Sequence, residues 1–219
     1  AGRGTGGRGG GGRGASSDKP KEKKPSIKER LQGVVNLNDP NTLYTDFIKI
    51  GEGASGSVFS AVEIATGDKW AVKQMVLSRQ PKPDVLINEI SLMKSCQHPA
   101  IVHFHDSFLV VETLWVVMEL VVGEDLTQVL TCNDMTEPQI AVVTRESLLA
   151  LDHLHQQRII HRDIKSDNIM VSGVNGDVKL TDFGFGAQLT NEQANRKSMV
   201  GTSYWMAPEV IQSDEYDEK

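Results

Sequence analysis

Two aspartates within residues 160–184 stand in sequences that could support phosphoryl chemistry. One ends a His-Arg-Asp sequence at Asp163 and is followed by Asn168, and the other begins an Asp-Phe-Gly sequence at Asp182. Transfer of a phosphoryl group to a hydroxyl needs an acceptor for the hydroxyl proton and hard oxygen ligands for Mg²⁺. Asp163, Asn168 and Asp182 are residue types that supply these groups.

A β-hairpin is predicted between the two motifs. Residues 168–171 and 177–180 are predicted to form short strands, and Asn175-Gly176 between them is a preferred hairpin turn. Such a hairpin would hold both motifs at one end of a small sheet. Either motif alone is compatible with a surface turn, but the two together at this separation favour one shared site.

A glycine-rich turn lies upstream, between predicted strands at residues 47–50 and 57–62. The glycines Gly51, Gly53 and Gly56 give a GxGxxG pattern, which dinucleotide-binding turns also contain. A dinucleotide fold would place a helix directly after the third glycine, whereas here a strand follows. Glycines in such a turn let backbone N–H groups approach phosphate oxygens that a Cβ would block.

A lysine and a glutamate in the next two elements form a candidate ion pair. The strand predicted at residues 70–76 places Ala71 and Lys73 on one face, because side chains alternate along a strand. The helix predicted at residues 84–96 has Glu89 within a stripe of apolar residues. A carboxylate in that position needs a cation, and Lys73 is the candidate.

The helix predicted at residues 139–155 follows an apolar strand at residues 114–120 and a small acidic segment at residues 122–125. Its predicted buried side comprises Ile140, Val143, Ser147, Leu148, Leu151 and Leu154. We do not expect His153 and His155 to bind a metal, because no third ligand lies within reach by sequence.

Composition indicates an ordinary folded protein. With 219 residues and 39% hydrophobic residues the chain can bury a core, in one or two domains. Cys96 and Cys132 have no metal-ligand spacing, which is typical of a reducing compartment. The longest apolar run is interrupted by Glu119 and is too short for a transmembrane segment, and the N-terminus has no apolar signal core. We therefore expect a cytoplasmic location.

Residues 1–37 are predicted to be a disordered tail, with the fold beginning near Leu43. The formal net charge of −6 conceals a basic excess of +6 in residues 1–30 and −12 in the remainder. The Gly/Arg-rich start resembles RGG segments of RNA-binding proteins, but it has no aromatic residues for base stacking, so we do not expect a nucleic-acid partner. The basic run at residues 19–24 would give a weak attraction to a membrane surface or act as a solvated linker.

Taken together, these motifs resemble a eukaryotic protein kinase and, more closely, the p21-activated kinase branch of the Ste20-like group. The resemblance covers residues 38–210 and rests on GEGASGSVFSAVEIATG, AVKQM, INEI, LWVVMEL, HRDIKSDNI, VKLTDFGFGAQLT and SMVGTSYWMAPEV. It implies an α+β, bilobal protein kinase-like fold in residues 38–219. The N-lobe, about residues 44–119, would contain an antiparallel sheet and helix C; the partial C-lobe, about residues 120–219, would be mainly helical.

The resemblance also implies ATP and Mg²⁺ as cofactors and assigns their contacts. Asp163 would act as base, Lys165 would meet the γ-phosphate, and Lys73 with Glu89 would position the other phosphates. Asn168 and Asp182 would bind the metal. The remaining nucleotide contacts would be made by Ile50, Gly51, Gly53, Gly56, Val58, Ala71, Met118, Glu119, Leu120, Asp125 and Met170.

Regulatory residues follow from the same resemblance. Ser198 stands where close relatives have a phosphorylated threonine in the activation loop, and Arg162 would pair with the phosphate. Thr202 would meet Asp163 and Lys165 and favour Ser/Thr substrates. Three positions depart from the branch, where Pro, Cys and Gly are usual; they are Ser203, Gly186 and Glu124.

The implied function is that of a protein serine/threonine kinase acting on protein substrates, downstream of a Rho-type small GTPase that would bind through regions not seen in this sequence. After residue 209 the family continues through helices that this sequence does not contain, so we expect exposed apolar surface under the catalytic loop and poor stability. The alternative is a truncated, inactive fragment that binds nucleotide or partners as a scaffold.

Overall fold

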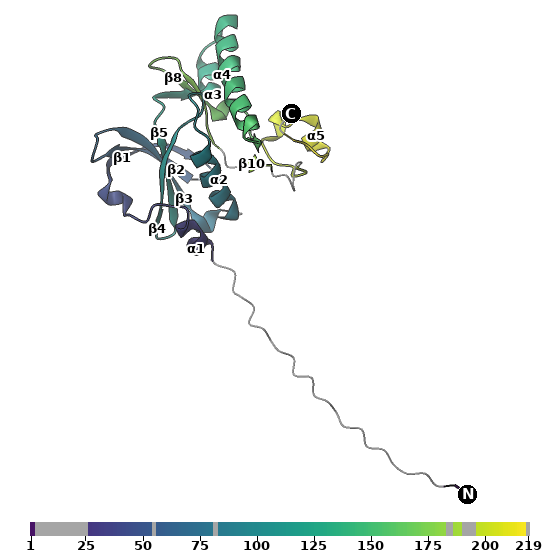
Figure 1. Cartoon of the computed structure of the whole chain (residues 1–219). Helices are drawn as coiled ribbons and strands as arrows, with labels where there is room; N and C mark the ends of the chain where they lie inside the picture. Colours follow the sequence, from purple (N-terminus) through teal and green to yellow (C-terminus); the bar gives the residue numbers. More distant parts are fainter. Residues whose placement is uncertain (3–25, 54–55, 81–82, 183–185, 190–195, 218–219) are drawn as a thin grey trace.

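The computed structural model describes residues 1–2, 26–53, 56–80, 83–182, 186–189 and 196–217 (Figure 1). Three predictions concern residues outside these ranges. They are the disorder and binding properties of residues 3–25, the middle of the glycine-rich turn at Ala54 and Ser55, and the Phe-Gly half of the Asp-Phe-Gly motif.

A five-stranded antiparallel sheet forms the first half of the structure, as the sequence predicts. Its strands are β1 (Tyr44–Gly53), β2 (Gly56–Glu63), β3 (Lys69–Val76), β4 (Phe104–Val110) and β5 (Thr113–Glu119), in the order β1-β2-β3-β5-β4. Helix α2 (Pro83–Ser95) lies against the sheet (Figure 1). Strand alternation divides the apolar side chains between the two faces.

The face of the sheet that meets α2 contains the main core. Met75 of β3 and Val116 of β5 pack there with Leu86 and Ile90 of α2. The opposite face has a smaller cluster in which Val72, Val117, Phe108 and Trp115 meet Tyr44 and Ala61. The prediction that Ala71 and Lys73 share one face is confirmed, since Ala71 lies in the α2-side core and Lys73 pairs with Glu89 of α2.

The N-terminal boundary differs from the prediction, because residues 26–37 belong to the folded unit. Helix α1 (Ile27–Gln32) begins with a capping box between Ser26 and Glu29, and the side chain of Leu31 is completely buried. The backbone N–H of Asn36 donates to the carbonyl of Ser107 in β4 (2.7 Å), and the Lys94 ammonium of α2 donates to the carbonyl of Val34.

The predicted tail is therefore wrong for these twelve residues, and the folded unit includes Ser26. The physical reason is a short amphipathic pattern, in which Ile27, Leu31, Val34 and Val35 face the core while the residues between them are charged or polar. The surrounding Lys, Arg and Pro residues hide that pattern when composition is averaged over a longer window. A short 3₁₀ turn, η1 (Pro40–Thr42), then leads into β1.

The second half combines small sheets with helices. Strands β6 (Gly123–Asp125), β8 (Ile169–Ser172) and β9 (Val178–Leu180) form one sheet, and β7 (Ile159–Ile160) pairs with β10 (Ala187–Gln188). The helices are α3 (Leu126–Cys132), α4 (Glu137–Gln156) and α5 (Pro208–Ile211). Single 3₁₀ turns occur at η2 (Leu77–Arg79), η3 (Ser166–Asn168) and η4 (Ser203–Trp205). The predicted hairpin between the two aspartate motifs is confirmed as β8 and β9.

The predicted buried side of α4 is only partly correct. Ala150 and Leu154 are fully buried near β7 and β9, but Ile140 and Leu148 are exposed. The helix packs along its C-terminal half against these strands, and within the described ranges nothing covers the apolar residues of its other side. None of the helices in those ranges is both long and apolar enough to cross a membrane.

The revised boundary predicts a stability difference between two nearby leucines. Replacing Leu31, which is 0% exposed, by Ala should lower the free energy of unfolding by about 2–5 kcal/mol, because it removes a buried side chain and leaves a cavity. Leu37→Ala is the matched control; Leu37 is 75% exposed, and the change should stay within about 0.5 kcal/mol. Denaturant unfolding of both variants measures this, and equal values would contradict the packing of residues 26–37.

Candidate active site

Asp163 lies at the centre of the site, on the turn that follows β7. Its carboxylate is buried and accepts a hydrogen bond from the Thr202 hydroxyl (2.7 Å) and another from the Asn168 side-chain amide (3.0 Å). The same amide donates to the Asp163 carbonyl (2.8 Å), and the Lys165 ammonium lies 3.5 Å from the carboxylate. The structure thus brings together four residues that the sequence predicts to share the site.

His161 supports this turn from the inside, a role that the sequence analysis missed. Its Nδ1 accepts the backbone N–H of Asp163 (3.3 Å), so Nε2 must hold the proton and donate to the Thr181 carbonyl (3.0 Å). Burial lowers the pKa of His161, and the Thr181 carbonyl and the carboxylates of Asp182 and Asp163 offset this only in part. A neutral imidazole therefore connects the two aspartate motifs. In the sequence, the position of His161 directly before Arg162 and Asp163 was the signal that could have indicated this role.

Lys73 lies between two carboxylates where the sheet meets the second half of the chain. Its Nζ is 3.1 Å from Oδ1 of Asp182 and 3.8 Å from Oε1 of Glu89. Burial lowers the pKa of Lys73, but the facing carboxylates of Asp182 and Glu89 outweigh that effect and leave the pKa raised. Burial raises the pKa of Glu89, Lys73 opposes the shift, and Asp182 adds to it. One ammonium against two carboxylates leaves excess negative charge at this point.

The predicted metal ligands provide suitable oxygen atoms. The Asp182 carboxylate is partly accessible to solvent. The amide nitrogen of Asn168 is engaged with Asp163, which leaves its amide oxygen available to a ligand. Carboxylate and amide oxygens are the donors that Mg²⁺ prefers, so these residues fit the ion chemically. The described ranges contain no cluster of three or more His, Cys, Asp or Glu residues suited to a metal.

Two residues near these ligands have left-handed backbone conformations. The φ angles of Arg162 and Asp182 are +67° and +66°. Such conformations cost about 1–3 kcal/mol for residues other than glycine and are concentrated at functional sites. The Arg162 guanidinium donates to the carbonyl of Gly186 (3.4 Å), which fastens the turn to the segment after Asp182.

The described glycines of the glycine-rich turn lie at the ends of β1 and β2. Gly53 pairs with Gly56 where β1 meets β2, and Val58 lies opposite Lys73 in the β2–β3 register. Gly56 has φ +154°, and a Cβ there would lie 2.1 Å from the carbonyl oxygen of Gln74. Glycine is therefore required at this position by close backbone approach as well as by conformation.

The predicted nucleotide contacts fall on two neighbouring groups of strands. Ala71 lies opposite Met118 in the β3–β5 register, next to Glu119 at the end of β5. Asp125 lies opposite Met170 in the β6–β8 register, and its carboxylate accepts the backbone N–H of Gln128 (2.9 Å) at the start of α3. Gly51 and Ile50 are in β1, and Leu120 directly follows β5.

Ser198, the predicted regulatory serine, lies in the described segment at residues 196–217. Its carbonyl accepts a hydrogen bond from the Tyr216 hydroxyl (2.7 Å), and the Ser198 side chain is exposed. Arg196 pairs through its backbone with Tyr216, and Lys197 forms an ion pair with Glu215 (3.0 Å). The pairing of Arg162 with a phosphate at Ser198 stays a prediction.

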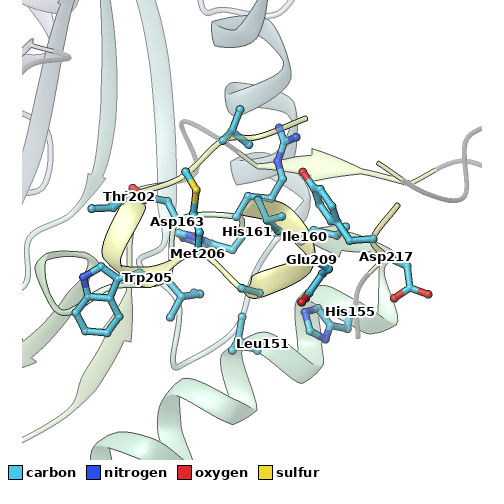
Figure 2. Close-up of a pocket in the computed structure, with 16 residues that line it drawn as sticks. Leu151, His155, Ile160, His161, Asp163, Thr202, Trp205, Met206, Glu209 and Asp217 are labelled. Atoms are coloured by element: carbon cyan, nitrogen blue, oxygen red, sulfur yellow. Dashed lines mark hydrogen bonds between the residues drawn. The ribbon is translucent and has the colours of Figure 1, made fainter. Parts of the chain in front are cut away.

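A separate cavity of about 400 Å³ borders the same turn (Figure 2). Figure 2 shows Asp163 and Thr202 at one side of it and Leu151 and His155, from α4, at another. Its remaining lining is mainly apolar and includes Trp205 and Met206. Lys73, Asn168 and Asp182 do not line this cavity, so it is distinct from the candidate nucleotide site.

Comparison with known proteins gives a match to the protein kinase domain over residues 44–219. The chain is 53% identical over 201 residues to serine/threonine-protein kinase PAK 1 of Mus musculus, covering 92% of this chain and 37% of that protein. It is 54% identical over 202 residues to serine/threonine-protein kinase SMU1 of Mycosarcoma maydis, covering 90% and 27%. Serine/threonine-protein kinase ste20 of Emericella nidulans is 53% identical over 193 residues, covering 88% and 23%. The chain thus spans between 23% and 37% of the length of these curated relatives.

The neutral state of His161 predicts a pH dependence of stability. Because the pKa of His161 is lowered in the folded state from its ordinary value of 6.5, the unfolded chain binds a proton that the folded chain does not as the pH falls through 6.5. This difference in proton binding lowers the free energy of unfolding at acid pH, and it disappears at pH values above the ordinary pKa of histidine. We expect His161→Gln to show a shallower fall in unfolding free energy between neutral and mildly acidic pH, measured by denaturant titration. Parallel curves for the two proteins would contradict a neutral, buried His161.

Proposed function

The chain belongs to the protein kinase family, and we propose that it transfers the γ-phosphate of ATP to serine or threonine residues of proteins. One observation supports this most directly, namely the buried Asp163 carboxylate fixed by Thr202, Asn168 and Lys165. An oriented carboxylate that a substrate hydroxyl can reach is the group that such a transfer needs. The relatives of the chain are named serine/threonine-protein kinases.

In this proposal each residue of the site has a separate role in the transfer. Asp163 accepts the proton of the substrate hydroxyl, while Thr202 and Asn168 keep its carboxylate in one orientation. Lys165 and Lys73 place positive charge next to the phosphates, and Glu89 of α2 holds the Lys73 ammonium from the side of the helix. Asn168 and Asp182 would hold Mg²⁺, whose positive charge would offset that of the phosphates.

The nucleotide base is proposed to lie between the two groups of strands. The β3–β5 register places Ala71 beside Met118, and the backbone that follows at Glu119 and Leu120 would meet the adenine edge. Val58 and the glycines of the β1–β2 turn would cover the phosphates, and Ile50 would cover the base. Asp125 would contact the ribose, and Met170, its neighbour in the β6–β8 register, would lie under the base.

Regulation is proposed to act through the segment after Asp182. A phosphate on the exposed Ser198 would add charge that Arg162 can pair with, and Arg162 already contacts the carbonyl of Gly186 on this segment. The resemblance to p21-activated kinases supports a Rho-type small GTPase upstream, binding through regions not assigned in this sequence. We also propose a cytoplasmic location, which the unpaired Cys96 and Cys132 support.

A second candidate function is a scaffold that binds nucleotide or partners without transfer. The apolar cavity beside the catalytic turn and the exposed apolar side of α4 favour this alternative, because such surfaces are typical of interaction sites. The geometry of Asp163 alone does not distinguish a kinase from a scaffold. A measurement of turnover distinguishes them.

The transfer proposal predicts that Asp163→Asn lowers turnover by about 10²–10⁴-fold, the usual contribution of a general base. The isosteric amide should leave nucleotide binding and the unfolding temperature nearly unchanged. The measurement is transfer of labelled phosphate from ATP to a Ser/Thr peptide and to the chain itself, with mass spectrometry to locate the phosphate.

Lys73→Met serves as a second variant, which should lose turnover because it removes the phosphate-positioning ammonium. Equal turnover in wild type and both variants would refute the proposal. Nucleotide binding without transfer in the wild type would favour the scaffold, and self-phosphorylation at sites other than Ser198 would contradict the regulatory part.

A further inference from the structure

Lys179 of β9 lies at a junction of three separate segments. Its ammonium contacts both carboxylate oxygens of Glu119, at 2.9 and 3.0 Å, and donates to the carbonyl of Pro99 (2.9 Å). The Lys179 side chain is 14% exposed and that of Glu119 is 31% exposed. The three donors of the ammonium are thus directed at two acceptor groups from different parts of the chain.

Glu119 is held on its other side as well. Its carboxylate accepts the backbone N–H of His103 (3.2 Å), and its own backbone N–H donates to the carbonyl of His103 (2.8 Å). Both ends of this residue are therefore fixed to the segment between α2 and β4. The Lys179 side chain is the contact that joins Glu119 to β9.

The segment at residues 99–103 also binds β9 directly through the backbone. The N–H of Leu180 donates to the carbonyl of Ala100 (2.8 Å), and the carbonyl of Leu180 accepts the N–H of Val102 (2.9 Å). The side-chain pair thus reinforces a backbone connection between the five-stranded sheet and the sheet that leads to Asp182. Lys179 precedes Asp182 by three residues.

We propose that Lys179 is a positioning residue for the nucleotide, which fixes the adenine-side backbone at Glu119 relative to the metal-side aspartate, Asp182. The inference rests on the proposed function, since it takes the end of β5 as the adenine contact. A site whose two ends are held in the bound arrangement loses less freedom when the nucleotide binds. Removing the clamp lowers nucleotide affinity and leaves the catalytic groups around Asp163 in place.

The contacts of the pair distinguish this role from general support of the fold. Among the described residues, neither Lys179 nor Glu119 forms a hydrogen bond or ion pair with Asp163 or Lys73, and the backbone bonds of Leu180 hold β9 without them. A positioning role therefore predicts a change in nucleotide affinity and KM with little change in kcat. A purely structural role predicts a lower unfolding temperature without that split.

The test is the affinity for the non-hydrolysable ATP analogue AMP-PNP with Mg²⁺, measured by calorimetry, together with KM and kcat for ATP. Lys179→Met should weaken AMP-PNP binding and raise KM by about fivefold, the size expected for a partly exposed ion pair. Lys179→Arg keeps the charge and should restore most of the affinity. Lys69→Met is the matched control, because Lys69 is an exposed lysine at the start of β3 with no ion pair among the described residues.

Coupling between the two residues is tested with Glu119→Gln. This variant should weaken binding to a similar extent, and adding Lys179→Met to it should cause little further loss, since both remove one interaction. Unchanged affinity in Lys179→Met, additive losses, or a fall in kcat at constant KM would overturn the proposal. If the wild type binds AMP-PNP but transfers no phosphate, the affinities still decide on the clamp while the proposed transfer fails.

Discussion

The structure depends above all on the placement of one largely buried ammonium, that of Lys73, between the carboxylates of Glu89 and Asp182. Moving a charge out of water is unfavourable unless partners compensate, and loss of one partner leaves the others uncompensated. The three residues come from β3, from α2 and from the loop after β9. Their charges can meet only if the five-stranded sheet, the helix upon it and the second half of the chain are held in register.

Contacts on both sides of α2 hold the sheet, the helix and the second half of the chain in register. On one side Ile90 and Leu86 meet the sheet, and at the end of the helix Lys94 holds the N-terminal segment through Val34. On the other side the Asn88 amide donates to the carbonyl of Gly186 (3.0 Å), the same carbonyl that Arg162 contacts. The helix that contains Glu89 is thus tied to the turn that contains Asp163. Charge placement and the orientation of the proposed base are consequently linked.

Residue types and spacing were sufficient to predict most of the strands and the grouping of Asp163 with Asn168 and Lys165, because alternating apolar residues indicate strands and the two aspartate motifs occur together at a short separation. The contacts that the sequence did not reveal are long-range. The Lys179–Glu119 pair joins residues sixty positions apart, and a single lysine in a short strand is normally a solvent-facing residue. The predictions for residues 26–37 and for the buried side of α4 were wrong or partly wrong for a related reason. An amphipathic pattern shows which residues are apolar, but it does not show which part of the protein packs against them.

The central claim, that Lys73, Asn168 and Asp182 together hold a magnesium nucleotide, is tested most directly by titrating AMP-PNP into the chain with and without Mg²⁺. The Asp182 carboxylate would face the bound phosphates, so it would repel them without the ion and would serve as a ligand when the ion is bound. The account predicts much tighter binding with Mg²⁺ in the wild type and loss of that difference in Asp182→Ala. Equal affinity with and without Mg²⁺ in the wild type, or a Mg²⁺ effect that survives in Asp182→Ala, would contradict it.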